Sequence, residues 1–449
     1  FTRAPKTPLF TRLPMSRNPQ TRHPLLDSHV LPPFAEIRAE HVKPAIEQIL
    51  ADNRAQLDAL LANPPAQWTW ANLIEPQDDM GERLGRAWSP VSHLNAVMNS
   101  PELREAYESC LPLLSQYYTE MGQNQALFDA YQQLADSDEF AKLDTAQQTI
   151  LEHALRDFKL SGIALPPEQQ KRYGELQMRL SELQSTFSNQ VLDATQAWTK
   201  HITDAAQLDG LPESALAQAK QAAEARELDG WLITLEFPSY FPVMTYASDR
   251  ALRQEVYTAF CTRASDQGPN AGQFNNGPVI DEILVLRQEL AELLGFANYA
   301  ELSLATKMAE STDQVLGFLR DLGERSKPFA QQDLAALKAF AAEQGCDDLQ
   351  PWDVGFYSEQ LRQQRTRQAN AAAASLQCTF VQGNARSLSS LYPAHSFDAI
   401  VTNAPWGVQV KRADHGPPSR HPPHRLLHTT KTLLPPSLAG RSSSKTIKS

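Results

Sequence analysis

The most regular hydrophobic pattern in the chain lies between Pro278 and Met308. Apolar residues recur there at three- and four-residue steps, which is the period of one face of an α-helix. The stripe comprises Val279, Ile283, Leu286, Leu290 and Leu293, and Ile280, Leu284 and Leu294 widen it. Pro278 suits the first turn of a helix and Gly295 its end. We therefore predict a helix that is buried within a large helical body.

Similar patterns predict helices at about 40–61, 103–122, 124–135, 145–158, 166–194 and 249–260, and a pair of helices within 313–344. Along the helix at 166–194, apolar residues alternate in steps of three and four, which is typical of a coiled-coil seam. These residues are Tyr173, Leu176, Leu180, Leu183 and Phe187. Two heptads favour pairing with a neighbouring helix of the same domain over an isolated coiled coil.

One short segment has the character of a strand. Residues 231–237 are rich in apolar and β-branched residues and lie between Gly230 and Pro238. We predict that this segment pairs with residues 198–203 in a hairpin. The predicted fold class is thus mainly α: a multi-helical lobe with a short β-hairpin.

Composition divides the chain of 449 residues, which has a formal net charge of −11. Residues 366–449 contain ten Lys or Arg against two acidic residues, so the preceding part is strongly acidic. This argues against nucleic-acid binding, except weakly through the basic tail. No apolar run is long enough to cross a membrane, so no membrane partner is expected. The scattered Cys110, Cys261, Cys346 and Cys378 form no CxxC motif and favour a reducing cytoplasm.

The candidate chemistry is sparse. None of the eleven histidines begins an HExxH motif, in which two histidines share one helical face with a general-base glutamate. His424 and His428 have that interval, but Arg425 occupies the glutamate position. We interpret His93 and His153 as packing or surface residues, and Cys346 as unreactive. The loop from Asp266 to Gly277 has two interpretations: a lid over a site, or a polar connection between helices, which is favoured. We predict no catalytic and no metal-ligating residue.

A family resemblance covers residues 25–365, about three quarters of the chain. The matching segments include Ser89–Asn95, Ser100–Arg104, Leu155–Phe158, Arg179–Leu183, Pro238–Tyr246, Thr262–Asp266, Leu284–Glu301 and Lys307–Ala309. They resemble the thimet oligopeptidase/neurolysin family of zinc metallopeptidases. The resemblance implies two helical lobes beside a channel and the hydrolysis of short peptides. It also implies one zinc, held by the HExxH histidines and a downstream glutamate.

In that family the zinc ligands lie downstream of the point, near Arg365, at which this sequence departs from the pattern. No family site residue can therefore be transferred, and we expect no zinc to bind this chain. We interpret the chain as a truncated, cytoplasmic member that is inactive alone, with short peptides as the family's partners. The alternatives are a non-catalytic module that binds peptides or a partner, and a chimera with an RNA or DNA methyltransferase fragment.

The second alternative rests on Phe397–Gly407, which resembles the strand and turn of nucleic-acid N-methyltransferases. The resemblance implies that Asn403, Pro405 and Trp406 form a base-binding motif, although Ala404 replaces its first proline. We accordingly predict a short α/β remnant at 366–412. It would lie between the helical region and a disordered, basic Pro/Ser-rich tail at 413–449, with a disordered leader at 1–24.

Overall fold

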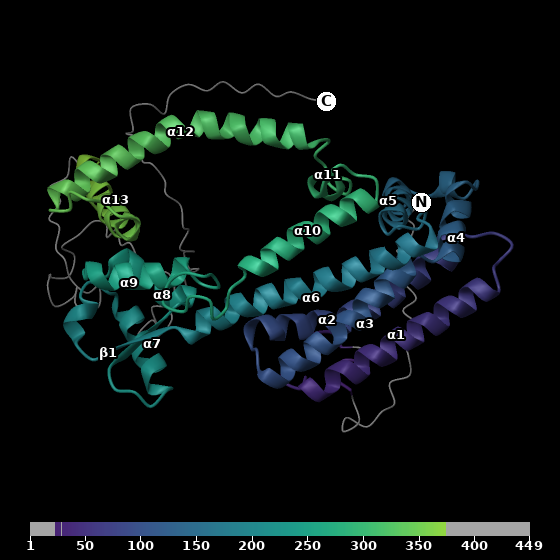
Figure 1. Cartoon of the computed structure of the whole chain (residues 1–449), viewed down its shortest axis with the longest axis horizontal. Coiled ribbons are helices and arrows are strands. Elements are labelled where there is room, and N and C mark those ends of the chain that lie inside the picture. Colours follow the sequence, from purple (N-terminus) through teal and green to yellow (C-terminus); the bar gives the residue numbers. More distant parts are fainter. Residues whose placement is uncertain (1–22, 28, 374–449) are drawn as a thin grey trace, which may run out of the picture. The chain divides into compact units, whose positions relative to one another are not determined.

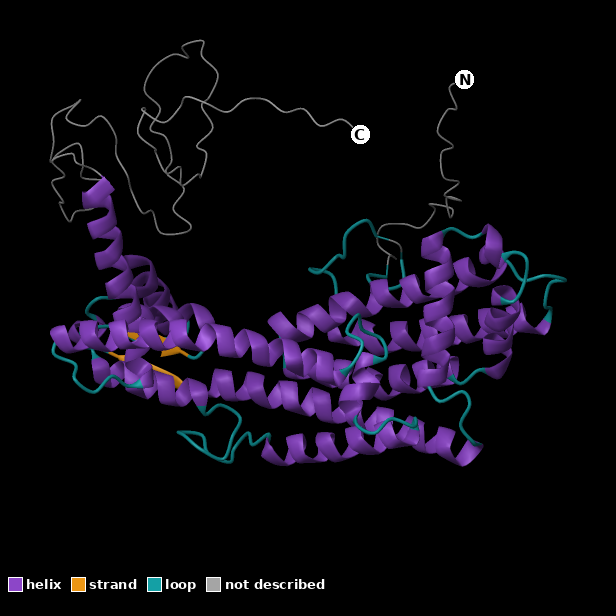
Figure 2. Ribbon diagram, turned by 90° about the horizontal axis from the view of Figure 1, so that it is seen from above, coloured by secondary structure: helices purple, strands orange, loops and turns teal. Residues whose placement is uncertain are grey.

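The computed structural model describes residues 23–27 and 29–373. Within these residues it contains thirteen α-helices and one sheet of two strands (Figure 2). The predicted fold class, mainly α with a short β-hairpin, is confirmed. The predicted leader up to residue 22, the predicted α/β remnant from residue 374 onward and the predicted tail at 413–449 lie outside the described residues.

Three long helices, α1 (Ala39–Ala62), α2 (Glu75–Val97) and α3 (Pro101–Gly122), lie side by side (Figure 1). A π-helical turn, η2 (Trp70–Ile74), leads into α2. Helices α4 (Gln125–Ala135) and α5 (Thr145–Leu160) pack together after them, with the short η3 (Phe140–Lys142) between. The start of α3 is set by Ser100, whose side chain accepts a hydrogen bond from the Leu103 amide at 3.2 Å.

Helix α6 (Pro167–Ala197) packs against α3 on one side and α10 (Gly277–Leu293) on another. Its predicted seam residues Leu176, Leu180 and Leu183 are buried together with Ile283 and Leu290 of α10. The prediction that this seam pairs with a helix of the same domain is therefore confirmed. On the other side, Arg104 of α3 donates to both carboxylate oxygens of Asp193 at 2.7 and 2.6 Å.

The predicted hairpin consists of β1 (Thr199–Ile202) and β2 (Trp231–Thr234), which pair antiparallel. Gly230 precedes β2 with φ of 89°, and a Cβ there would lie 2.4 Å from the Ile202 carbonyl oxygen, so the turn requires glycine. The segment between the strands holds η4 (Ala205–Leu208) and α7 (Glu213–Glu224). The second strand is shorter than predicted: α8 (Phe237–Tyr246) begins at Phe237, because Pro238 fits its first turn.

The remaining helices are α9 (Arg250–Cys261), α11 (Tyr299–Leu304), α12 (Thr312–Glu343) and α13 (Pro351–Ala373). The prediction of two helices within 313–344 was wrong, because α12 is a single helix of 32 residues. Pro328 lies inside it. Proline removes one backbone donor but does not have to end a helix.

A buried carboxylate joins α9 to α13. The Asp353 side chain is 0% exposed and accepts hydrogen bonds from Arg250 at 2.7 Å and from Arg253 at 2.8 Å. Arg253 is itself 1% exposed. Burial alone would raise the pKa of the Asp353 carboxyl, but the hydrogen bonds from the two arginines hold that pKa below its usual value. The cluster therefore requires an ionised carboxylate.

Replacing this carboxylate should destabilise the protein. At pH 7, Asp353→Asn should lower the free energy of unfolding by about 3 kcal/mol, because Arg253 would stay buried without a counter-charge. Because the Asp353 pKa is lower in the folded protein than in the unfolded chain, where it is about 4, the ionised carboxylate stabilises the folded state at pH values above about 4. This stabilisation is lost as the pH falls through the pKa of the folded state. The gap between variant and wild type should therefore narrow in acid. Urea unfolding at several pH values measures this difference in the free energy of unfolding. A difference that does not change with pH would contradict the assignment of an ionised Asp353 carboxylate.

Candidate functional site

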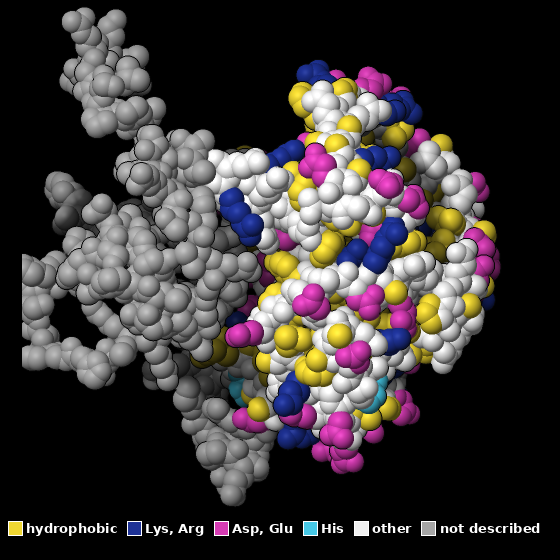
Figure 3. All heavy atoms as spheres, turned by 90° about the vertical axis from the view of Figure 1, so that its left-hand side faces the viewer, with side chains coloured by type: hydrophobic (Ala, Val, Ile, Leu, Met, Phe, Trp, Pro, Cys, Tyr) yellow, Lys and Arg dark blue, Asp and Glu magenta, His cyan; other side chains and the backbone are white. Residues whose placement is uncertain are grey.

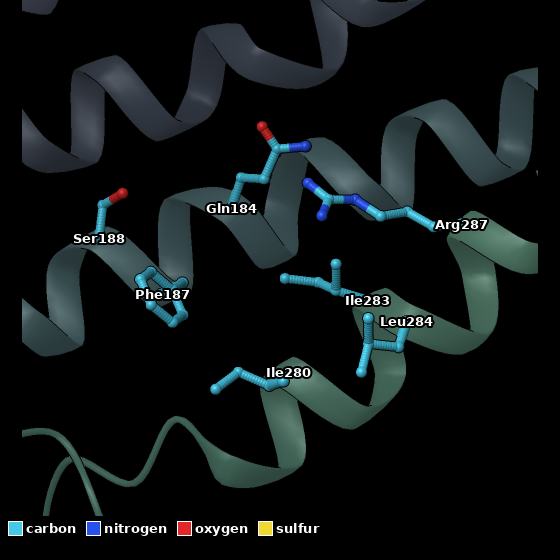
Figure 4. Close-up of a pocket in the computed structure, with 7 residues that line it drawn as sticks. All are labelled: Gln184, Phe187, Ser188, Ile280, Ile283, Leu284 and Arg287. Carbon is cyan, nitrogen blue, oxygen red and sulfur yellow. The ribbon is translucent and has the colours of Figure 1, made fainter. Parts of the chain in front are cut away.

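A groove of about 330 Å³ lies between α6 and α10. Its size falls at the lower end of the range of small-ligand pockets. Its lining consists of Gln184, Phe187, Ser188, Ile280, Ile283, Leu284 and Arg287 (Figure 4). The groove lies along the same pair of helices as the seam, on the part of α6 that follows Leu183.

Most of the groove surface is apolar and accessible. Phe187 is 37% exposed, Ile280 44% and Leu284 58%. The prediction that Ile280 and Leu284 belong to a buried stripe was therefore wrong, although Ile283 and Leu290 are buried as predicted. Periodicity correctly places the apolar residues of α10 on neighbouring positions, but α6 covers only one side of that band.

Two polar side chains face each other across the groove. Figure 4 shows Gln184 of α6 and Arg287 of α10 reaching toward one another beside Ile283. The Arg287 guanidinium stacks on the Tyr299 ring at 4.8 Å, and within the described residues no carboxylate forms an ion pair with it.

Two other arginines at the contact between α6 and α10 do have acidic partners. Arg172 and Arg179 on α6 form ion pairs with Glu289 and Glu282 of α10, each at 2.6 Å. Both pairs are solvent-exposed, and such pairs contribute little stability. Arg287 thus supplies a positive charge beside an apolar surface, and no carboxylate of the described residues forms an ion pair with it.

This arrangement suits binding rather than bond cleavage. The apolar wall can accept a hydrophobic side chain, and Arg287 can hydrogen-bond to a carboxylate or a carbonyl oxygen. The lining contains no His, Cys, Asp or Glu that could act as a nucleophile or general base. Sequence reasoning did not find this site. Arg287 among the apolar residues of α10 was its only signal.

The residues described do not fit the zinc that the family resemblance implies. Across 23–27 and 29–373, no three His, Cys, Asp or Glu side chains come together in a group able to hold a metal ion. The imidazole rings of His23 and His41 meet edge to face with their centroids 5.3 Å apart, and the His23 Nδ1 already accepts a hydrogen bond from the Leu25 amide. His93 packs against Phe34. No zinc chemistry is therefore assigned to these residues.

Two other candidates from the sequence, Cys346 and the loop between α9 and α10, lie in defined contacts. Cys346 is buried, with its thiol 3.7 Å from the Asp348 carbonyl oxygen. The loop between α9 and α10 ends at the buried Asn276, whose side-chain amide donates to the Phe187 carbonyl at 3.1 Å. The loop is thus anchored to α6 beside the groove. Asn403, Pro405 and Trp406 lie outside the described residues.

Comparison with known proteins identifies the origin of this architecture. Residues 46–171 match the family model described as "Neurolysin/Thimet oligopeptidase, N-terminal domain", and residues 243–393 match "Peptidase family M3". This helical region belongs to peptidase family M3. Oligopeptidase A of Salmonella typhimurium is 58% identical over 342 residues, which are 76% of this chain and 50% of that protein. Oligopeptidase A of Escherichia coli is 57% identical over the same shares.

A more distant relative is matched over a similar share. The "Probable cytosolic oligopeptidase A" of Arabidopsis thaliana is 39% identical over 78% of this chain and 50% of its own length. The chain thus spans about half the length of the relatives it matches. The M3 match includes α10 and continues to residue 393, beyond the departure near Arg365 that the sequence suggested. The comparisons lend no support to the methyltransferase resemblance.

One face of the described surface carries mixed charge. On the face drawn in Figure 3, acidic and basic side chains are interspersed among apolar ones and form no patch of one sign. No helix in the described part of the chain is long and apolar enough to cross a membrane. Neither observation points to a ligand other than the one that the groove suggests.

The two sides of α10 should respond differently to the same truncation. Leu290→Ala should cost about 3 kcal/mol of unfolding free energy, because Leu290 is 4% exposed in the seam with α6. Leu284→Ala should cost less than about 0.5 kcal/mol, because Leu284 lines the open groove. Thermal or urea unfolding measures both variants. Equal losses would show that the groove is closed in solution.

Proposed function

We propose that this chain works in the hydrolysis of short peptides, as the helical half of an M3 oligopeptidase. The observation that carries this proposal is the identity of 57–58% to two oligopeptidase A proteins over 342 residues that are half of each. At that identity the helices and their packing are retained, and the match includes the family's N-terminal domain.

The groove between α6 and α10 gives this half a role in handling the peptide. A hydrophobic side chain of the peptide would lie against Phe187 and Leu284, where burial of apolar area favours binding. The peptide's terminal carboxylate or a carbonyl group would face Arg287, which lacks an acidic partner within the described residues. The proposal assigns binding to these side chains and no step of bond cleavage.

The catalytic step is assigned to polypeptide outside the matched half. The family resemblance implies zinc held by HExxH and a downstream glutamate, and the printed sequence contains no HExxH. When bound, zinc lowers the pKa of a coordinated water enough to give hydroxide near neutral pH. We therefore propose that the chain alone does not hydrolyse peptides and that zinc ligands come from the other half.

We also propose a cytoplasmic location. One Arabidopsis thaliana relative bears the name "Probable cytosolic oligopeptidase A". In this chain, the described Cys110, Cys261 and Cys346 are free thiols, and two of the three are buried. Unpaired thiols suit a reducing compartment.

A fluorogenic peptide assay tests the division of labour. The purified chain with added zinc should cleave a quenched short peptide no faster than buffer with zinc, because a metal-bound water needs ligands that the proposal places elsewhere. Cleavage by the chain alone, abolished by a chelator, would contradict the proposal. A preparation of Escherichia coli oligopeptidase A provides the positive control for the substrate.

Calorimetry tests the binding role separately. Arg287→Gln should weaken binding of a short peptide with an apolar C-terminal residue about tenfold, because a charge-assisted hydrogen bond is lost. Arg226→Gln is the matched control, since Arg226 is exposed in the turn after α7 and does not line the groove. An amidated peptide should lose less affinity on the same change. Equal peptide affinity of the wild type and Arg287→Gln would contradict the proposed role of the groove in peptide binding.

A further inference from the structure

Helix α12 is uncovered over most of its length. Within the described residues it contacts α11 near its start and α13 near its end (Figure 1). Between these contacts, every residue from 316 to 335 is exposed. Long helices in water owe most of their stability to the packing of an apolar face against other elements. A helix of 32 residues held at its ends therefore lacks the packing that normally stabilises its middle.

The exposed part of α12 carries an apolar stripe. Residues three, four, seven and eight apart share one face of a helix. Four exposed residues with this spacing form what we call the α12 stripe: Phe318 (66% exposed), Leu319 (53%), Leu322 (52%) and Phe329 (67%). Exposed apolar surface arranged in one row indicates an interaction site more than scattered apolar residues do.

The α12 stripe continues an interface that is already formed. By the same helical period, Leu337 and Phe340 lie on the face that carries Leu322 and Phe329. Both are buried, and Phe340 meets the Tyr357 ring of α13 edge to face at 6.4 Å. One continuous apolar face is thus covered by α13 at its C-terminal end and uncovered in its middle.

The occupant follows from the length of the relatives. The match takes up half of each oligopeptidase A and includes the family's N-terminal domain, so about as much chain again lies beyond it. Helix α12 lies inside the M3 match, which continues beyond it through α13 to residue 393. We propose that the α12 stripe docks the second half of an M3 peptidase, through an apolar helical surface of that half. This inference rests on the proposed function, which identifies the partner.

Coexpression tests the docking directly. The probe is the segment of Escherichia coli oligopeptidase A that follows the matched 342 residues. It should copurify one to one with the tagged full chain. The double variant Leu322→Asp with Phe329→Asp should weaken the complex by at least about 30-fold, because charges would be buried in the interface. Gln331→Asp, which places the same charge on the opposite face of α12, should change binding less than threefold.

Each other occupant gives a distinct result. Concentration-dependent dimers of the chain that the double variant abolishes would show that a second copy covers the stripe, and would overturn the proposal. Protection of residues 316–335 from hydrogen exchange that disappears on deleting 374–449 would assign the stripe to this chain's own C-terminal segment and would also overturn it. Failure of the probe to copurify with a normally folded chain would likewise overturn the proposal.

Peptide cleavage by the copurified complex separates this inference from the proposed function. A complex that depends on the α12 stripe but cleaves no peptide would contradict the proposed function and leave the docking in place. If the complex cleaves peptide and the double variant forms it as tightly as wild type, the docking proposal is contradicted and the proposed function stands. Circular dichroism of the two variants and their melting curves show whether the chain itself stays folded.

Discussion

The antiparallel seam between α6 and α10 is the contact on which the rest of the described structure depends. Leu176, Leu180 and Leu183 of α6 are buried with Ile283 and Leu290 of α10, and exposed ion pairs flank this row. The other side of α6 packs on α3, so this one helix connects the N-terminal helices to the M3 part of the chain. Where the apolar surfaces of α6 and α10 are no longer fully covered, the groove appears.

Helical periodicity predicted this seam because the information is local. The steps of three and four residues in α6 and α10 specify which side chains share a face, and Ile283 and Leu290 are buried accordingly. Periodicity does not specify how much of that face a neighbour covers, so Ile280 and Leu284 were predicted to be buried and are exposed. The groove joins residues about a hundred positions apart. Only the tertiary pairing brings Gln184 beside Arg287.

The errors at α8 and α12 have local causes. Proline at the first turn starts a helix, as Pro238 does in α8, although apolar and β-branched residues just before it favour a strand. Pro328 inside α12 removes one hydrogen bond without dividing the helix. The absence of an HExxH motif was readable directly from the sequence. The α12 stripe was not, because its exposure depends on which surfaces α11 and α13 leave uncovered.

The groove between α6 and α10 and the α12 stripe share one property. Each is an apolar surface that extends a buried contact to a region where no described helix covers it. Uncovered helices open locally more often than helices in a core, and hydrogen exchange detects this. The most direct measurement is the exchange of residues 316–335 in the full chain, with and without the unmatched segment of Escherichia coli oligopeptidase A. We predict faster exchange than in α6 for the chain alone and strong protection in the mixture. Exchange as slow as in α6 for the chain alone, unchanged by the segment, would contradict the account.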